Sequence, residues 1–363
     1  MSAMTENDRI VLAMVSAALN GTEFDATLLC GKTPQQWSDI FRIVSQQGVL
    51  ALCYDIVNNL PPQSRPPKPL HIRFALSAER IEKRYFSQLA AARILSDELH
   101  AHGIRFFILK GLAISRYYPV PSKRECGDID CFLEDGYERG NRIAESMGAK
   151  VDRDYYKHSH ISYRGTLIEN HRFCTAVRGS SKAKELEKRL QTMIADCPSE
   201  RIEDTNILIP PADFNTVFLT RHALFHFLSE GITLRHIADW HRLLTARQND
   251  INWPQVNSIL EQNDMKTFAD AVTAICVKHL GLRIANPEIT TRSAFADKIL
   301  DDIFSEQTRL FASGFGKWKG RAMMISNILR NRWRYSQIYG HSITGELFKY
   351  AFGFIFDRNP RLD

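Results

Sequence analysis

The sequence predicts an α+β protein, in which a small mixed β-sheet core is flanked by helical N- and C-terminal regions. Two short apolar runs, at 106–109 and 128–133, have the length and composition of buried strands. Apolar residues recur at helical spacing within residues 8–60 and 70–102, and again from Ala212 onward. Strands in the middle of the chain with helices on either side of them indicate this fold class.

The length of the chain and its composition agree with a folded protein of two or three domains. At 363 residues the chain can bury a sizeable core, and its hydrophobic and charged fractions, 44% and 24%, are ordinary for a globular protein. We expect a helical N-terminal region at 1–95, the β-sheet core at 96–178 and a helical C-terminal region at 179–363. The net charge of +6 is a mild excess of base that does not by itself indicate nucleic-acid binding.

Cysteine usage and the absence of long apolar segments favour a cytoplasmic protein. The seven cysteines are scattered and odd in number, without a Cys-x-x-Cys pair, as in a reduced protein rather than a disulfide scaffold. The N-terminus carries Glu6 and Asp8 and lacks a long apolar core, so we expect no signal peptide. We also expect no membrane span, because Lys349 interrupts the most apolar late stretch, 347–356.

The N-terminal region is expected to be helical on both sides of a connector. Apolar stripes predict helices between residues 8 and 60. The proline-rich stretch 60–69 cannot form the interior of a helix and is therefore a connector. A long helix follows from about residue 70 to residue 102, and Gly103 ends it before the first core strand.

The core contains a pair of aspartates at the start of its second strand. The apolar strand 106–109 ends at Lys110-Gly111 and leads into a short helix, and the next strand starts with Asp128 and Asp130. Positions i and i+2 of a strand point to the same face, so the two carboxylates project together. Because neighbouring carboxylates repel each other, they favour a counter-charge, which a divalent cation supplies.

This order of elements resembles the DNA polymerase β-like nucleotidyltransferase superfamily. It is most similar to a little-characterised bacterial branch in which Lys-Gly replaces the usual Gly-Gly or Gly-Ser. The residues that carry the resemblance are Lys110, Gly111, Tyr118, Arg124, Gly127, Asp128 and Asp130. A His-x3-His pattern at 222–226 and Gly-Ile-x-Leu-Arg-x3-Asp at 231–239 extend it over roughly residues 70–250.

The resemblance implies a third carboxylate on a neighbouring strand. After the aspartate pair we expect a helix at about 137–147 and then two strands, 155–163 and 166–173. Glu169 on the second of these strands is the best candidate, and His171 follows it two residues later, as in the resembling branch. The alternative is that Glu169 and His171 form the solvent side of an antiparallel strand.

The function that the resemblance implies is Mg²⁺-dependent transfer of a nucleoside monophosphate from an NTP to an acceptor hydroxyl or phosphate. Asp128, Asp130 and Glu169 would hold Mg²⁺, or alternatively Mn²⁺, and Glu169 is also a candidate general base. The acceptor stays open, since a sugar phosphate, an aminoglycoside-like small molecule, a protein side chain and an RNA end all fit such a core.

Four residues are candidates for binding the nucleotide: Lys110, Gly111, Arg124 and His171. Gly111 lets backbone approach a phosphate closely, and the start of the following helix offers free N–H groups. Lys110 is equally well explained as a surface lysine at the end of a strand. Arg124 either contacts phosphate or pairs with Glu125.

Two functions of other classes also stay open. A non-catalytic nucleotide-binding or interaction protein with a degenerate nucleotidyltransferase fold would bind without turnover, and the lack of a serine or second glycine after Gly111 makes this plausible. A histidine-based metallohydrolase would use His158 and His160, two apart on a strand, or His222 and His226, four apart on a helix.

The C-terminal region is expected to be helical from Ala212 onward. Arg235 and Asp239 either form an i, i+4 ion pair on a helix surface, or Arg235 contacts the nucleotide or the acceptor. Between 307 and 345 basic and aromatic residues alternate without an acid, a pattern that can indicate nucleic acid or an anionic membrane surface. We favour a helix whose aromatic residues pack inward and whose arginines stay in water. An acidic partner for the basic stretch 309–334 is the second hypothesis.

Overall fold

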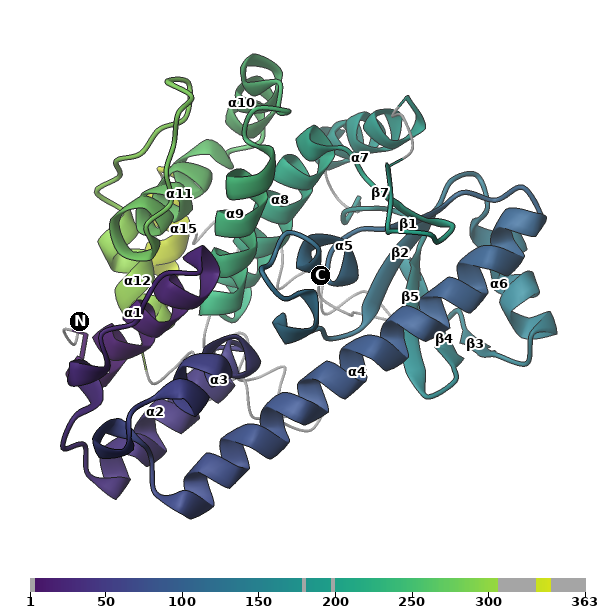
Figure 1. The fold of residues 1–363 in the computed structure, drawn as a ribbon. Coiled ribbons are helices and arrows are strands. Elements are labelled where there is room, and N and C mark those ends of the chain that lie inside the picture. The colour runs from purple at the N-terminus through teal and green to yellow at the C-terminus, as the bar shows by residue number, and fades with distance from the viewer. Residues whose placement is uncertain (1–3, 178–180, 197–199, 306–330, 341–363) are drawn as a thin grey trace.

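The protein is built from helices around one mixed sheet of seven strands (Figure 1). The computed structural model describes residues 4–177, 181–196, 200–305 and 331–340. This architecture confirms the predicted α+β class.

The N-terminal region is helical, as predicted. Its helices are α1 (Glu6–Asn20), α2 (Pro34–Gln46), α3 (Leu50–Asn59) and α4 (Lys68–Ala101). Thr5 and Thr33 begin α1 and α2 with capping boxes. In each box the threonine side chain accepts a hydrogen bond from the backbone N–H three residues later, and the side chain of that later residue accepts one from the backbone N–H of the threonine. The proline-rich stretch between α3 and α4 contains one short 3-10 turn, Pro62–Ser64, as a connector should.

The long helix α4 joins the N-terminal helices to the sheet (Figure 1). Its 34 residues span roughly 50 Å. Near its start, Phe74 and Ala78 are buried in the core of the helical regions, whereas Leu95 and Leu99 near its end are buried against the sheet. One helix therefore contributes to both hydrophobic cores and fixes their relative position.

The sheet has the strand order β3-β4-β5-β2-β1-β7-β6, with β2 parallel to β5 and antiparallel to β1. The strands are β1 (Phe106–Ile108), β2 (Ile129–Leu133), β3 (Lys150–Asp152), β4 (His158–Tyr163), β5 (Thr166–His171), β6 (Glu200–Arg201) and β7 (Ile207–Ile209). The sequence predicts β1, β2, β4 and β5. The other three strands have only two or three residues, which is too short for an alternating pattern.

The sheet extends past the range expected for the core. Strand β7 pairs in parallel with β1, and β6 pairs with β7, so both lie in the sheet although they follow residue 178. Helices α5 (Leu112–Ser115), α6 (Tyr137–Ser146) and α7 (Ser181–Ala195) connect the strands. The domain boundaries at 95 and 178 stay predictions.

The C-terminal helices pack together with the N-terminal ones in a single core. They are α8 (Ala212–Ser229), α9 (Leu234–Arg247), α10 (Trp253–Gln262), α11 (Lys266–Leu280), α12 (Ala296–Ile303) and α15 (Arg332–Tyr339). Helix α1 contacts both α9 and α11, and Figure 1 shows α1 beside these C-terminal helices. The helical regions that the sequence separates thus form one body in the fold.

The described end of the basic stretch is buried rather than solvated. Residues 309–330 lie outside the described residues. In α15, Arg334 is only 1% exposed and donates to both carboxylate oxygens of Asp302, so the expectation that arginines here stay in water is wrong for this residue. Trp333 packs edge-on against Phe227 and Phe295, as the inward packing of aromatic residues predicts.

Helices of the described part of the chain do not resemble membrane spans. The longest, α4, carries charged residues along its exposed side. Over the described ranges, no helix is both long and apolar enough to cross a membrane. The late apolar stretch 347–356 lies outside these ranges.

A buried histidine makes the stability of the fold depend on pH. His241 of α9 is fully buried, and burial lowers the pKa of its imidazole to about 4. An unfolded histidine has a pKa of about 6.5, so between these values only the unfolded chain binds the proton, and stability is lost as the pH falls. Lowering the pH from 7 to 5 should cost on the order of 2 kcal/mol through this residue.

Chemical denaturation of the protein and of His241→Gln at pH 7 and pH 5 measures this contribution. The variant should lose less stability on acidification than the parent, by roughly that amount. The exposed His100→Gln is the matched control and should keep the loss of the parent. An equal loss in His241→Gln and the parent would contradict the assignment.

Candidate functional site

Polar side chains gather on one face of three neighbouring strands. On β2, Ile129 and Cys131 face the core formed with α4 and α6, so Asp130 between them points to the opposite face. Glu169 of β5 is directly opposite Asp130, and His160 of β4 is directly opposite Glu169. Register and alternation thus place an aspartate, a glutamate and a histidine in one row across the sheet.

A second row of the same face contains two more histidines. His171 of β5 is opposite His158 of β4. The register of this hairpin is set by a two-residue turn, Arg164-Gly165, in which both residues have positive φ, 49° and 74°. Such a turn matches the twist of the two strands, and Tyr163 and Thr166 pair directly beside it. The solvent-side alternative for Glu169 and His171 does not fit, because His171 is only 2% exposed.

Asp130 is a buried carboxylate that is held ionised by its neighbours. Its Oδ1 lies 3.0 Å from Lys110 Nζ and 3.1 Å from His171 Nε2. Burial disfavours the charged form, but the lysine and the histidine outweigh it, so the pKa of Asp130 lies below its ordinary value. Its Oδ2 is buried without a hydrogen-bond partner among the described residues.

Asp128 lies just before β2, on a peptide that α4 holds in place. The carbonyl oxygen of Gly127 accepts hydrogen bonds from Arg84 and Gln88, both on α4. Burial and the neighbouring charge of Asp130 raise the pKa of Asp128 above its ordinary value. The two aspartates therefore repel each other, as the Asp-x-Asp spacing predicts, and the repulsion disfavours the ionised form of Asp128.

Glu169 and His171 add a carboxylate and an imidazole to this cluster of charged side chains. Burial disfavours the charged carboxylate, but the hydrogen bond from His171 and the nearby imidazoles of His158 and His171 together outweigh it and lower the pKa of Glu169 to about 2. Burial opposes protonation of His171, yet its bonds to Asp130 and Glu169 raise the pKa of this imidazole. Its Nδ1 also donates to the carbonyl of Phe173, at 3.2 Å, so both ring nitrogens act as donors.

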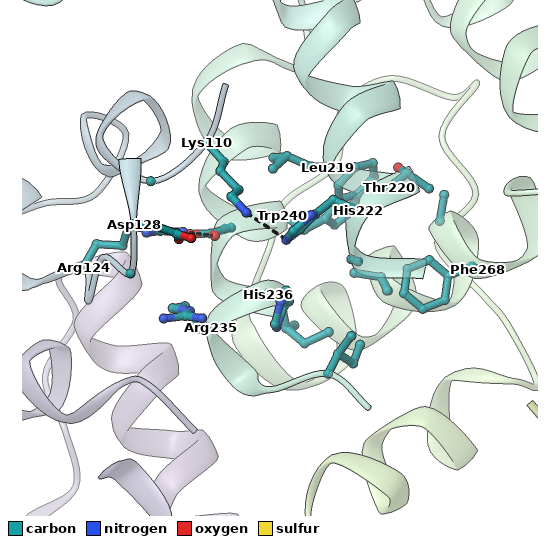
Figure 2. A pocket seen from close by; sticks show the side chains of 18 residues that line it. Lys110, Arg124, Asp128, Leu219, Thr220, His222, Arg235, His236, Trp240 and Phe268 are labelled. Carbon is teal, nitrogen blue, oxygen red and sulfur yellow. Dashed lines mark hydrogen bonds and ion pairs between the residues drawn. The ribbon is translucent and has the colours of Figure 1, made fainter. Parts of the chain in front are cut away.

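Lys110 lies over the carboxylates rather than on the surface. Its side chain is 21% exposed, and its Nζ contacts Asp130 and, at 3.5 Å, Nε2 of His222 on α8 (Figure 2). Burial and the charge of Lys110 lower the pKa of His222 well below its ordinary value, so the ring is neutral and accepts from the ammonium group. The interpretation of Lys110 as a surface lysine does not fit this position.

Two pockets meet at Gly127 and Asp128. The first, drawn in Figure 2, lies between the sheet and helices α8, α9 and α11. Its polar lining includes Lys110, Arg124, Asp128, Thr220, His222, Arg235, His236 and Asp239. The second lies between α4 and the β4–β5 hairpin and is lined by Arg84, Ser87, Gln88, Gly127, Asp128, Arg164, Gly165, Thr166 and Leu167. Asp128 is thus accessible from both sides.

A buried ion pair forms the wall of the first pocket. Arg124 donates through Nε and Nη2 to the two carboxylate oxygens of Asp239, at 2.9 and 2.6 Å. Tyr118 donates to the same carboxylate at 2.7 Å, and all three side chains are buried. Tyr118 and Arg124 of the first sequence motif thus meet Asp239 of the second. Their contacts bind the loop before Asp128 to helix α9.

Two predictions about these charges are wrong. Asp239 does not form a surface pair with Arg235, because it faces the interior and binds Arg124. Arg235 instead donates to the backbone carbonyl of Glu125, at 3.4 Å. Arg124 likewise pairs with Asp239 and not with the Glu125 side chain, although its Nη1 reaches the Glu125 carbonyl at 3.2 Å. That Nη1 lines the pocket near Gly111, so the predicted contact between Arg124 and phosphate stays a prediction.

The two histidine pairs that the sequence offers as metal ligands have different surroundings in the structure. Within the described ranges, one group has the geometry to hold a metal ion: His158, Glu169 and His171. His222 and His226 lie ring to ring, with centroids 4.5 Å apart, but one binds Lys110 and the other binds Glu230. The His222–His226 spacing thus serves local contacts.

Several residues of the site escape prediction from the sequence. Arg84 and Gln88 of α4 look like members of a solvated helix face, and only the tertiary fold brings them to Gly127. His236 lines the first pocket from α9, where its Nδ1 accepts from the backbone N–H of Thr233. The His-x3-His pattern marks His222 in the sequence, but no sequence pattern indicates its contact with Lys110.

Breaking the buried ion pair should destabilise the fold strongly. Asp239→Ala leaves the Arg124 guanidinium buried without a counter-charge, which should cost roughly 3–5 kcal/mol in denaturant unfolding. The double variant Arg124→Met/Asp239→Leu removes both charges and should recover most of that loss. Glu145→Ala, which removes the exposed partner of Arg153, is the control and should cost much less. A small loss in Asp239→Ala would show that the pair does not hold the loop.

Comparison with known proteins gives one match. A family model described as uncharacterised nucleotidyltransferase matches residues 33–281, from the start of α2 to the end of α11. No curated protein and no solved structure matches the chain. The matched span contains the aspartate pair, the sheet, both pockets and the Arg124–Asp239 ion pair. The chain therefore belongs to this family of uncharacterised nucleotidyltransferases, whose substrates include a nucleotide.

Proposed function

We propose that the protein transfers a nucleoside monophosphate from an NTP to an acceptor, with Mg²⁺ held by Asp128, Asp130 and Glu169. The observation that carries the proposal is the direct pairing of Asp130 with Glu169 across two parallel strands, next to Asp128. Membership of a nucleotidyltransferase family supports the reaction class. Three carboxylates within one face of a sheet support the cation.

The residues present fit Mg²⁺. This cation prefers hard oxygen ligands, and the three carboxylates supply them. The buried Oδ2 of Asp130 lacks a partner among the described residues, which leaves one lone-pair-bearing oxygen free to coordinate. Asp128, Asp130 and Glu169 would hold the cation, which would supply neutralisation of phosphate charge and a lower pKa for the attacking hydroxyl. Mn²⁺ takes similar ligands and is an alternative.

The first pocket suits the NTP. Lys110 and Arg235 offer positive charge to the phosphates, together with the Nη1 of Arg124. Gly111 adopts φ 55° and ψ −110°, a conformation that residues with a Cβ rarely take, which supports a turn where a phosphate approaches backbone closely. The rings of His222 and His236 line the deeper part, where a base can pack (Figure 2). His222 would act by positioning Lys110.

The second pocket suits the acceptor, because it reaches the same Asp128 from the other side. Its lining is mainly polar, with Arg84 and Arg164 as cations and Ser87 and Thr166 as hydroxyl groups. An acceptor entering there would meet the NTP at Asp128. Glu169 stays the candidate general base, since it lies directly opposite Asp130 on the same face of the sheet.

Removal of either aspartate should abolish transfer without unfolding the chain. Titration of the protein with the four NTPs, with and without Mg²⁺, follows nucleotide binding and pyrophosphate release. Asp128→Asn and Asp130→Asn should lower Mg²⁺-dependent pyrophosphate release about 100-fold or more, because each loses a ligand that stabilises the transition state by several kcal/mol. Circular dichroism checks that both variants stay folded.

The control for this experiment is Asp154→Asn, an exposed acid of the segment between β3 and β4, which should keep parental release. Full release in Asp128→Asn would contradict the proposed role of the carboxylates. Tight Mg²⁺-dependent NTP binding without release, across an acceptor screen, would instead favour a non-catalytic nucleotide-binding protein.

The assignment of the NTP to the first pocket and of the acceptor to the second gives a separate prediction. Lys110→Met should weaken NTP binding by roughly tenfold or more, since it removes a charge-assisted contact to phosphate. Arg164→Gln, in the second pocket, should leave the Kd for NTP unchanged and raise KM for the acceptor. Calorimetric titration with NTP measures the first effect. A weakened NTP Kd in Arg164→Gln together with a parental one in Lys110→Met would reverse the assignment of the two pockets.

A further inference from the structure

We infer that His158, Glu169 and His171 form a second cation site, specific for a transition metal such as Zn²⁺ and distinct from the site of the two aspartates. The three residues each offer a ligand atom, and these atoms all lie within 4.8 Å of one another. They come from two paired strands with fixed register, so the backbone already places them together. The inference does not depend on nucleotidyl transfer.

The geometry converges on the Glu169 carboxylate. Nε2 of His158 lies 3.5 Å from Oε1, and Nε2 of His171 lies 3.5 Å from Oε2. A third imidazole, that of His160, has its Nε2 3.3 Å from Oε1. Zinc binds nitrogen and carboxylate oxygen at about 2.0–2.2 Å in a tetrahedron, which holds its ligand atoms at similar separations. Small side-chain rotations suffice to close such a site.

Ordinary ion pairing does not account for His158. Its Nε2 lies 3.5 Å from the Glu169 carboxylate, which is longer than an ordinary N–H···O hydrogen bond. Its Nδ1 is buried and has no hydrogen-bond partner among the described residues. The side chain is 11% exposed and packs edge-on against Tyr155, with Nε2 directed at the glutamate. Imidazole nitrogen is the commonest protein ligand of transition metals.

The surroundings of His171 also match a metal ligand. Metal-bound histidines usually donate their second ring N–H to a carbonyl or a carboxylate, which orients the ring. Here Nδ1 of His171 donates to the carbonyl of Phe173. Its Nε2 then faces both Asp130 and Glu169, and a bound cation would replace the proton that it carries there.

The ligand set separates this site from that of Mg²⁺. Imidazole nitrogen suits zinc and its neighbours among the transition metals, whereas Mg²⁺ takes oxygen almost exclusively. Asp128 does not belong to the group of atoms that converge here. Glu169 is shared, so a cation at the histidines would be expected to affect binding at the aspartates.

Calorimetric titration of the metal-stripped full chain with ZnCl₂, in the absence of nucleotide, tests the inference. We expect one Zn²⁺ per chain, bound more tightly than Mg²⁺ at this site because two of its ligand atoms are imidazole nitrogens. His158→Phe keeps an aromatic ring against Tyr155 but removes the ligand, and it should weaken Zn²⁺ binding by about tenfold or more. Circular dichroism and thermal unfolding without metal confirm that the variant folds.

Two controls decide where the zinc binds. Asp128→Asn should keep parental Zn²⁺ affinity even though it abolishes pyrophosphate release, so the two proposals can fail separately. His226→Gln, which alters the other histidine pair, should also keep it. Absence of Zn²⁺ binding would overturn the inference. So would parental affinity in His158→Phe, or a loss confined to His226→Gln.

Discussion

The buried ion pair between Arg124 and Asp239 is the interaction on which the arrangement of the site depends. Two opposite charges away from water are stable only when each satisfies the other, and here both carboxylate oxygens receive guanidinium hydrogen bonds. The pair connects the loop that carries Asp128 to a helix more than a hundred residues later in the chain. It therefore turns two regions that could otherwise move apart into the two walls of one pocket. The residues that resemble a family motif at Tyr118, Arg124 and Asp239 are explained by this structural role.

The second constraint is the concentration of charge on one face of the sheet. Asp128, Asp130 and Glu169 repel one another, and the structure answers with Lys110 and a protonated His171. This balance distributes the electrostatic cost unevenly, since the pKa of Asp128 is raised while those of Asp130 and Glu169 are lowered. Lys110 thus has two competing attractions, the carboxylate and any phosphate that enters the pocket. Under the proposed function, a phosphate in the pocket and the Asp130 carboxylate would compete for the same ammonium group.

Local sequence patterns predict the parts of this site that depend on local structure. The Asp-x-Asp spacing, the strand with Glu169 and the helices on either side follow from periodicity and from turn residues, because these act over a few positions. The partner of Arg124 could not be found in this way. Its choice of Asp239 over the adjacent Glu125 reflects which carboxylate is buried beside it after folding. The strands β6 and β7 were missed because two or three residues carry no period, and their place in the sheet is decided by pairing with β1.

The hairpin turn at Arg164-Gly165 has a consequence for how this chain can vary. Side chains alternate along both strands, so the pairing of His160 with Glu169 and of His158 with His171 depends on a turn of this length. Insertion or deletion of one residue there would shift the register and move the histidines out of line with Glu169, even though every histidine remained in the sequence. Evolutionary drift in loop length, usually harmless at a protein surface, is therefore restricted at this exposed tip. Among homologous chains, the length of this turn should vary less than its composition.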